Sequence, residues 1–155
     1  MKLKDVALIT GAAAVIAAVA LNTDIKTPAE YYALHPTEVT DDGAYVTLKI
    51  DSSRVSNGSV ILEGKYALAS GDSVFDVASR VLNFEGVPFD YKGGRNIYVQ
   101  SIDGLDEFEF GAQSGWVYTV NGEMPGVSCA QYEPCSGDEI VFLYVDELYD
   151  GGDMK

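Results

Sequence analysis

The last third of the chain combines two strand patterns with two sharp turn signals, and these restrict the fold more than any other feature. Between Trp116 and Val120 large residues alternate with period two, which is typical of a strand with two unlike faces. Asn121-Gly122 then supplies the two positive-φ residues of a type I′ hairpin turn. Gly137-Asp138 predicts another reversal. The β-branched and aromatic segment from Ile140 to Val145 predicts a final strand.

One segment has the pattern of an amphipathic helix. Asp72 or Ser73 can cap its first amides, and Asp76 stands three residues after Ser73, as in a capping box. Gly86 is the expected C-terminal stop. Its apolar side chains form one stripe at helical spacing: Val74, Val77, Ala78, Val81 and Leu82. We therefore predict a helix over residues 73–85 that packs on a sheet.

Further strands are predicted on both sides of this helix. Residues 45–50 alternate, with Val46, Leu48 and Ile50 on one face. Residues 60–68 extend again, with Gly64 as an expected bulge or bend. Residues 97–102 form a strand pattern that ends at Asp103-Gly104. One helix laid across a mixed sheet predicts an α+β fold of the β-grasp-like type.

Several short motifs occur together in an order known from one protein family. They are Tyr45 to Asp51, Leu68 to Val77, Ser114 to Tyr118, Val120 to Gly122, Pro125, Tyr132 and Gly137-Asp138. From about Ala44 to Val145, the chain resembles the C-terminal domain of the transcobalamin and intrinsic factor family, and in particular its bacterial relatives, small exported domains of unknown function. In the vitamin carriers, the corresponding domain is the smaller half of a two-domain clamp that closes over a corrinoid. The resemblance therefore implies a β-grasp-like binding domain.

The size and charge of the chain exclude several classes of protein. Its 155 residues have room for one domain and a tail, not for two domains. Asp and Glu number 24 against 10 Lys and Arg, a net charge of −14. This balance argues against nucleic acid, which is bound through Lys and Arg, and against anionic lipid headgroups as the main partner. A solvated acidic surface is the simplest interpretation.

The N-terminus has the pattern of an export segment. Lys2 and Lys4 precede the apolar run from Val6 to Leu21, and small residues at Ala18 and Ala20 fit cleavage after Ala20. We predict a signal peptide, or alternatively an uncleaved anchor, at 1–20, a linker at 21–43, the transcobalamin C-terminal-like domain at 44–147 and an acidic tail at 148–155. The protein is then secreted or held at the cell surface, with residues 6–21 as its only membrane contact if uncleaved.

The two cysteines predict a disulfide. Cys129 and Cys135 are the only cysteines, and an even number outside the cytoplasm suggests pairing. The bridge would close a short loop before the last strand and contribute about 2–3 kcal/mol. Two free thiols are the alternative. A zinc site is disfavoured because two thiolates leave the ion short of ligands.

Catalytic chemistry is not indicated. The only histidine, His35, stands in the predicted linker, so a Ser-His-Asp site is improbable. Carboxylate pairs arise easily by chance among 24 acidic residues, and no Asp-rich stretch matches a calcium loop. We therefore predict a protein that is not an enzyme and that has no catalytic residues, no resident cofactor and no metal site.

The candidate binding surface lies on the strand at Trp116. An amphipathic ring beside Ser114-Gly115 would form an apolar shelf for a planar ligand or a partner protein. Trp116 as a core anchor is the alternative, and we expect partial exposure because Ser114-Gly115 leaves the ring accessible. The predicted ligand-binding residues are Ser114, Gly115, Trp116, Tyr118, Met124 and Pro125, with the loop from Gly122 to Val127 as the second surface.

Two functions follow from this surface and the resemblance. The first is an exported, non-catalytic binding module that resembles the cobalamin-capping domain of transcobalamin and takes a corrinoid or a similar amphipathic ligand. The second is a cell-surface protein–protein interaction domain, docking on an exported partner, with no small-molecule ligand.

Overall fold

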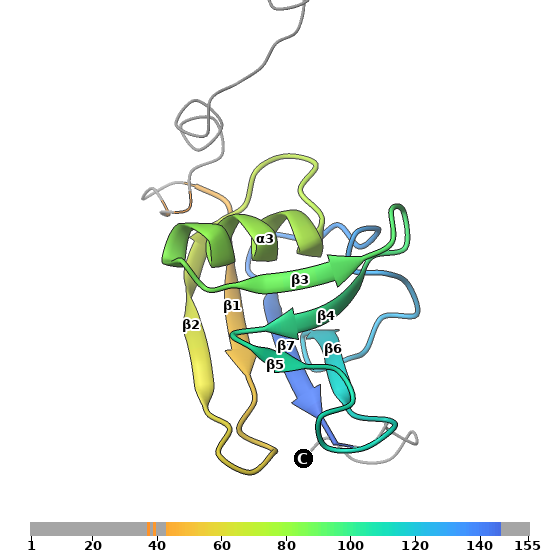
Figure 1. The fold of residues 1–155 in the computed structure, drawn as a ribbon. Coiled ribbons are helices and arrows are strands. Elements are labelled where there is room, and N and C mark those ends of the chain that lie inside the picture. The colour runs from red at the N-terminus through yellow and green to blue at the C-terminus, as the bar shows by residue number, and fades with distance from the viewer. Residues whose placement is uncertain (1–36, 38, 40–42, 147–155) are drawn as a thin grey trace, which may run out of the picture. The chain divides into compact units, whose positions relative to one another are not determined.

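Two sheets and one helix make up the described part of the protein in this computed structural model (Figure 1). The described residues are 37, 39 and 43–146, all within the unit His35–Lys155. One sheet has the order β2-β1-β7-β6, with β1 (Tyr45–Asp51), β2 (Val60–Ala67), β6 (Gly115–Val120) and β7 (Glu139–Val145). The other has the order β3-β4-β5, with β3 (Phe89–Lys92), β4 (Tyr98–Ile102) and β5 (Leu105–Asp106).

The larger sheet is mixed, as expected. β1 runs parallel to β7, whereas β2 is antiparallel to β1 and β6 is antiparallel to β7. Together with α3 (Val74–Glu85), the one helix among the described residues, this confirms the α+β, β-grasp-like fold class. The separate three-stranded sheet was not predicted. The export segment at 1–20, His35 and the tail at 148–155 lie outside the described residues, so the domain boundaries stay predictions.

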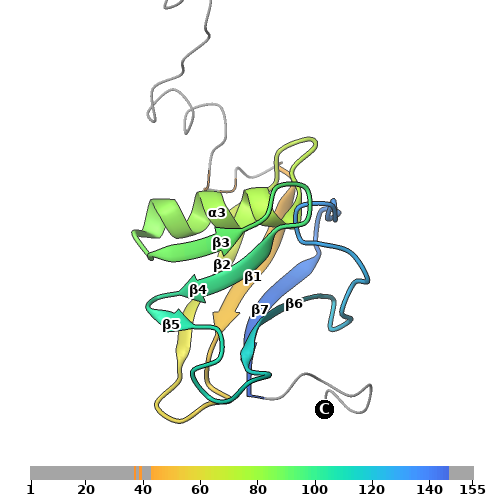
Figure 2. The same cartoon turned by 45° about the vertical axis from the view of Figure 1, so that its right-hand side comes forward.

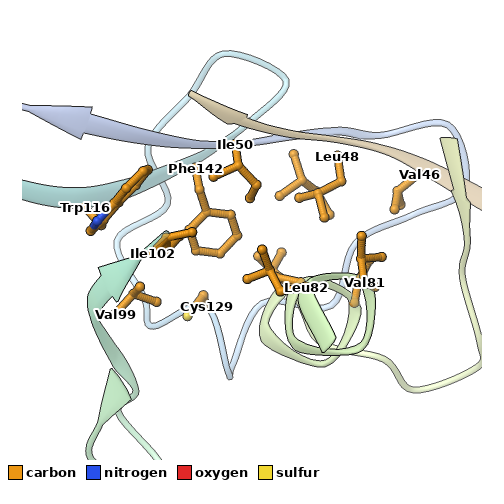
Figure 3. Packing of buried hydrophobic residues seen from close by; sticks show 14 of the residues in the cluster. Val46, Leu48, Ile50, Val81, Leu82, Val99, Ile102, Trp116, Cys129 and Phe142 are labelled. Carbon is orange, nitrogen blue, oxygen red and sulfur yellow. The ribbon is translucent and has the colours of Figure 1, made fainter. Parts of the chain in front are cut away.

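The core lies between the larger sheet and a second layer made by α3 and the smaller sheet (Figures 1 and 2). Val46, Leu48 and Ile50 of β1 are fully buried, which confirms the predicted inner face of that strand. They meet the apolar stripe of α3, all of which is buried. Figure 3 shows Phe142 of β7 among side chains from β1, β4 and α3.

The helix begins and ends as its sequence predicts. The hydroxyl of Ser73 accepts a hydrogen bond from the Asp76 N–H at 3.2 Å, and the Asp76 carboxylate accepts from the Ser73 N–H at 2.9 Å. This is the predicted capping box. Gly86 adopts a φ of 72°, the left-handed conformation that ends many helices. None of the helices in the described part of the chain has the length and hydropathy needed to cross a membrane.

One local expectation for β2 needs revision, and one residue of the predicted linker contacts this strand. Gly64 is not a bulge, because it pairs regularly with Leu48, and the register shift of this ladder lies between Ile50 and Asp51. The Tyr66 ring covers Gly64 so closely that a Cβ there would lie 2.9 Å from the phenol oxygen. Thr37, inside the predicted linker, is buried, and its C=O accepts a hydrogen bond from the Ala67 N–H at 2.9 Å.

The Asn-Gly turn forms, but the hairpin that it opens is very short. Asn121 and Gly122 have φ values of 52° and 82°, as a type I′ turn requires. Beyond the turn, only Glu123 bridges back to Val120. The strand that pairs with β6 along its whole length is β7, which comes after the loop.

Candidate functional site at the free edge of β6

β6 is an edge strand whose second edge borders a groove. The groove has a volume of about 240 Å³ and lies between three segments, residues 97–99, 116–118 and 124–129. We call it the β6 groove. Its lining is largely apolar and includes Ile97, Val99, Val117, Met124, Pro125 and Val127. Four of the predicted site residues therefore line one hollow: Trp116, Tyr118, Met124 and Pro125.

Ser114 and Gly115 line a different hollow. This smaller space, of about 110 Å³, lies against residues 112–117 together with Tyr98, Phe108 and Val145. We call it the Gly115 hollow. Trp116, Val117 and Tyr98 contribute to both spaces. The predicted site is thus divided into two neighbouring hollows, with Trp116 between them.

Trp116 is a core residue, so the expected partial exposure is wrong. Only 4% of its surface is exposed. Its indole N–H donates a hydrogen bond to the Leu105 C=O at 2.9 Å. Its ring packs edge-on against the ring of Tyr144, with the two ring centres 5.3 Å apart. Buried indole N–H groups usually find such an acceptor. Figure 3 shows Trp116 at one end of the core, beside Val99 and Ile102.

Ser114 also has a structural role. It is 1% exposed, and its hydroxyl donates to the Gly111 C=O at 2.9 Å. The same oxygen accepts a hydrogen bond from the Phe110 N–H at 3.0 Å and lies 3.1 Å from the Tyr144 hydroxyl oxygen, whose proton is donated to the Asp106 C=O at 2.7 Å. These bonds hold the loop before β6, in which Phe108 has a φ of 71°, an unusual value for a bulky residue. Ser114 therefore has no free hydrogen-bonding capacity that faces a ligand.

Tyr118 ties the groove-forming loop to β6. Its hydroxyl donates to the Val127 C=O at 2.7 Å, and its ring lies 6.0 Å from the ring of Phe142. Burial raises the pKa of Tyr118 to about 12. A second anchor joins the Ser128 hydroxyl to the Ile97 C=O at 2.9 Å. The loop at 124–129 is therefore held at a fixed distance from the strand.

Tyr98 is a site residue that sequence reasoning missed. Its ring lines both hollows, and a Cβ at Gly115 would lie 3.1 Å from its oxygen. Burial, and next a hydrogen bond to Glu107, raise the pKa of Tyr98 to about 12. The strand pattern at 97–102 was recognisable, but nothing in it indicated that β4 would lie beside β6.

Glu107 accepts hydrogen bonds from two side chains beside Tyr98. Its carboxylate accepts hydrogen bonds from Gln100 Nε2 at 2.9 Å and from Lys92 Nζ at 3.1 Å. The bond from Gln100 is the main cause that lowers the pKa of Glu107. Because Lys92 also lies 5.1 Å from the centre of the Tyr98 ring, the aromatic wall of the site carries one paired cation.

The predicted disulfide is absent, and both cysteines are free. Cys129 is buried beside the groove, whereas Cys135 is exposed. The backbones of the two cysteines form hydrogen bonds with different parts of the protein. The Cys129 C=O accepts a hydrogen bond from the Phe75 N–H, and the Cys135 N–H donates one to the Asp138 carboxylate. The loop thus directs one thiol into the core and the other to the surface, which sequence spacing could not reveal. Burial raises the pKa of the Cys129 thiol.

The hydroxyl and thiol groups of the β6 groove are already engaged or neutral. The Tyr118 and Ser128 hydroxyls in the groove already donate to backbone carbonyls, and the Cys129 thiol is held in its neutral form. Within residues 37, 39 and 43–146, there is no cluster of three or more His, Cys, Asp or Glu side chains that could hold a metal ion.

Comparison with known proteins gives one family. The family model "Domain of unknown function (DUF4430)" matches residues 65–146, just over half of the chain. No curated protein matches the chain.

Two solved structures are similar in fold. Haptocorrin in complex with Cbi has a TM-score of 0.52 and 13% identity over 71% of this chain, which spans 27% of the haptocorrin chain. A protein from Ruminococcus gnavus, described as a candidate metal-binding protein, has a TM-score of 0.46 and 18% identity, covering 68% of this chain and 99% of its own. At 13% identity, the likeness to haptocorrin shows the fold alone.

Proposed function

The chain belongs to the DUF4430 family of domains of unknown function, and we propose that its folded domain is a non-catalytic binding module whose ligand lies in the β6 groove. The observation that carries the proposal is the grouping of exposed apolar side chains at this site. Among the described residues, eight large hydrophobic side chains are exposed, and four of them line the two hollows: Tyr98, Phe108, Met124 and Val127. Grouped apolar exposure of this kind is typical of binding surfaces.

Absence of catalysis is part of the proposal. A general base or nucleophile needs a poised titratable group within reach of the substrate. The titratable groups that line the groove are Tyr98, Tyr118 and Cys129, and the pKa of each is raised by burial, so all three are neutral near pH 7. A neutral, apolar lining supports binding rather than turnover.

A corrinoid or a similar amphipathic molecule is the first candidate ligand. Haptocorrin, which shares the fold, is known in complex with Cbi. A volume of about 240 Å³ is below the roughly 300–1,000 Å³ of sites that enclose a small molecule. A corrinoid would therefore lie over the groove with one edge inserted, as a capping domain would hold it.

A partner protein is the second candidate. Two of the lining side chains, Phe108 and Met124, are 57% and 46% exposed, so the apolar surface is open to a ligand larger than the groove. Export to the cell exterior is part of both candidates and rests on the sequence pattern of residues 1–20. N-terminal sequencing of protein recovered from the medium and from the cell envelope tests the export and the cleavage after Ala20.

Two titrations test the binding function. Cobinamide is followed by its visible absorbance, and the apolar dye Nile red by its fluorescence. Val127→Glu should abolish binding, because it places a carboxylate in the groove, whereas the matched Val60→Glu, at 45% against 47% exposure, should not. Nile red binding that is lost only in the Val127 variant supports the module, and cobinamide binding with the same dependence supports a corrinoid ligand. Equal responses of the two variants would contradict the assignment to this groove.

A further inference from the structure

The free edge of β6 carries unpaired backbone groups. The Asn121 N–H donates to the Glu139 C=O, and Val120 and Glu123 exchange hydrogen bonds on the opposite side. Along an antiparallel ladder, the backbone N–H and C=O groups of successive residues point alternately toward and away from the partner strand. In β6, Trp116 and Tyr118 are residues whose backbone groups point away from β7. No hydrogen bond between described residues uses these four groups.

The other free edges of the two sheets are protected. β2 carries the charged residues Glu63 and Lys65, and the N–H of its last residue, Ala67, already donates a hydrogen bond to the Thr37 C=O. β3 has two charged residues and a register shift, and β5 is two residues long. Charges, bulges and short length are the usual means of preventing strand addition. β6, with the sequence GWVYTV, has six residues, no charge, no proline and a regular ladder to β7.

The two hollows follow each other along β6. The Gly115 hollow lies along residues 114–117, and the β6 groove along residues 116–118. The centres of these two stretches therefore differ by roughly one and a half residues, or about 5 Å of strand. An extended chain beside β6, in which residues i and i+2 share one face and lie about 7 Å apart, would reach both hollows from that face. Backbone pairing with side-chain pockets at alternate positions is the mode of strand addition.

A single extended segment fits this edge better than a second copy does. The loop at 124–129 stands beside β6 and is held there by the Tyr118–Val127 and Ser128–Ile97 hydrogen bonds. An approaching edge strand of another copy would bring its own loop into the same space. A peptide brings no second loop, so only the loop of this copy lies beside it.

The charge of the site defines the ends of the ligand. Glu123 is exposed beyond one end of β6, and Asp106 and Glu109 are exposed near the other. Lys92, on β3, is already paired with Glu107. With a net charge of −14, the protein favours basic residues on either side of an apolar centre.

We propose that the free edge of β6 binds an extended peptide segment of a partner protein, which joins the four-stranded sheet as a new strand, with apolar side chains at two alternate positions and basic residues at both ends. The inference rests on the proposed function, because it names the ligand of the same groove.

A peptide pool with alternate N-methylation tests the backbone pairing. The probe is a labelled pool, Lys-Thr-X-Thr-X-Thr-Lys with X as Leu, Val, Phe or Tyr, titrated against the full chain by fluorescence anisotropy. The tightest member is then made in two isomers, methylated on the amides of odd or of even residues. One isomer should bind about tenfold more weakly, since it loses the donors facing β6, and the other should bind like the parent. In hydrogen exchange, the parent should protect the amide of Tyr118.

Each other outcome contradicts a defined part of the argument. Equal binding of both isomers, or no Tyr118 protection, overturns strand addition and leaves the binding module intact. The same holds if no peptide binds below millimolar concentration while Nile red binds in a Val127-dependent manner. If neither peptides, Nile red nor cobinamide binds, the proposed function fails as well.

Discussion

The guanidinium of Arg80 and the carboxylate of Asp72 form a buried, two-point ion pair, with Nη2–Oδ2 at 2.7 Å and Nη1–Oδ1 at 3.2 Å. Arg80 also donates to the Ala67 C=O at 2.8 Å, and the Asp72 carboxylate accepts from the Ala69 N–H at 2.8 Å. Arg80 comes from the middle of α3, while Ala67 ends β2. The pair therefore fixes the helix to the end of the edge strand through the turn between them.

Removing one partner of this ion pair should destabilise the folded protein. Arg80→Met leaves the Asp72 carboxylate buried without its cation, so we expect the free energy of unfolding to fall by about 3–5 kcal/mol. Arg54→Met, at an exposed position, is the matched control and should change it by less than about 0.5 kcal/mol. Urea unfolding followed by circular dichroism measures both. Similar midpoints for the two variants would contradict a structural role for the pair.

The burial of Trp116 predicts both its fluorescence and the effect of its truncation. As the only tryptophan, it should emit at short wavelength and be quenched weakly by iodide. Trp116→Ala removes a buried ring and its bond to Leu105, so we expect a loss of about 3–5 kcal/mol of stability. Strong quenching in the folded protein would be inconsistent with this structure.

The two thiols should react at very different rates. Cys135 is exposed and should be alkylated readily in the folded protein, whereas Cys129 is buried with a raised pKa and should react only on unfolding. Mass spectrometry without reductant should show one added group in the native protein and two in denaturant. No added group in denaturant would mean that a disulfide forms. Cys135→Ser, which leaves Cys129 alone, should abolish the fast phase.

The raised pKa values of Tyr98 and Tyr118 predict that the folded protein loses stability in strong alkali. Both pKa values are raised from 10.0 to about 12, so the folded protein keeps two protons that the unfolded chain releases. The stabilisation is complete below pH 10 and is lost as the pH rises toward 12. Tyrosinate absorbance measured against pH, together with unfolding midpoints, checks this. Tyr118→Phe should remove part of the pH dependence, and an unchanged alkaline profile in that variant would contradict the assignment.

Local signals in the sequence determined the elements that depend on near neighbours. Ser73 and Asp76 specify the start of α3 through bonds within one turn, and Gly86 specifies its end through its own backbone conformation. The alternation from Val46 to Ile50 needs only the pleat of a strand to define an inner face. These features could be predicted because the residues that specify them are close in the sequence, although their stability still comes from packing against the rest of the chain.

The candidate site depended on contacts between residues far apart in the sequence. Whether Trp116 is a shelf or a core anchor was decided by the Leu105 carbonyl, which β5 brings to the indole. In the larger sheet, β7 lies between β1 and β6, so one edge of β6 has no neighbouring strand. The pattern of residues within a strand does not specify which other strand will pair with it. The groove itself exists because Tyr98 of β4 and the loop at 124–129 lie beside that edge. The amino-acid pattern determined which segments fold as strand or helix, because those preferences are local. Only the tertiary structure decided which surfaces remain open for a ligand, because burial depends on what the rest of the chain covers.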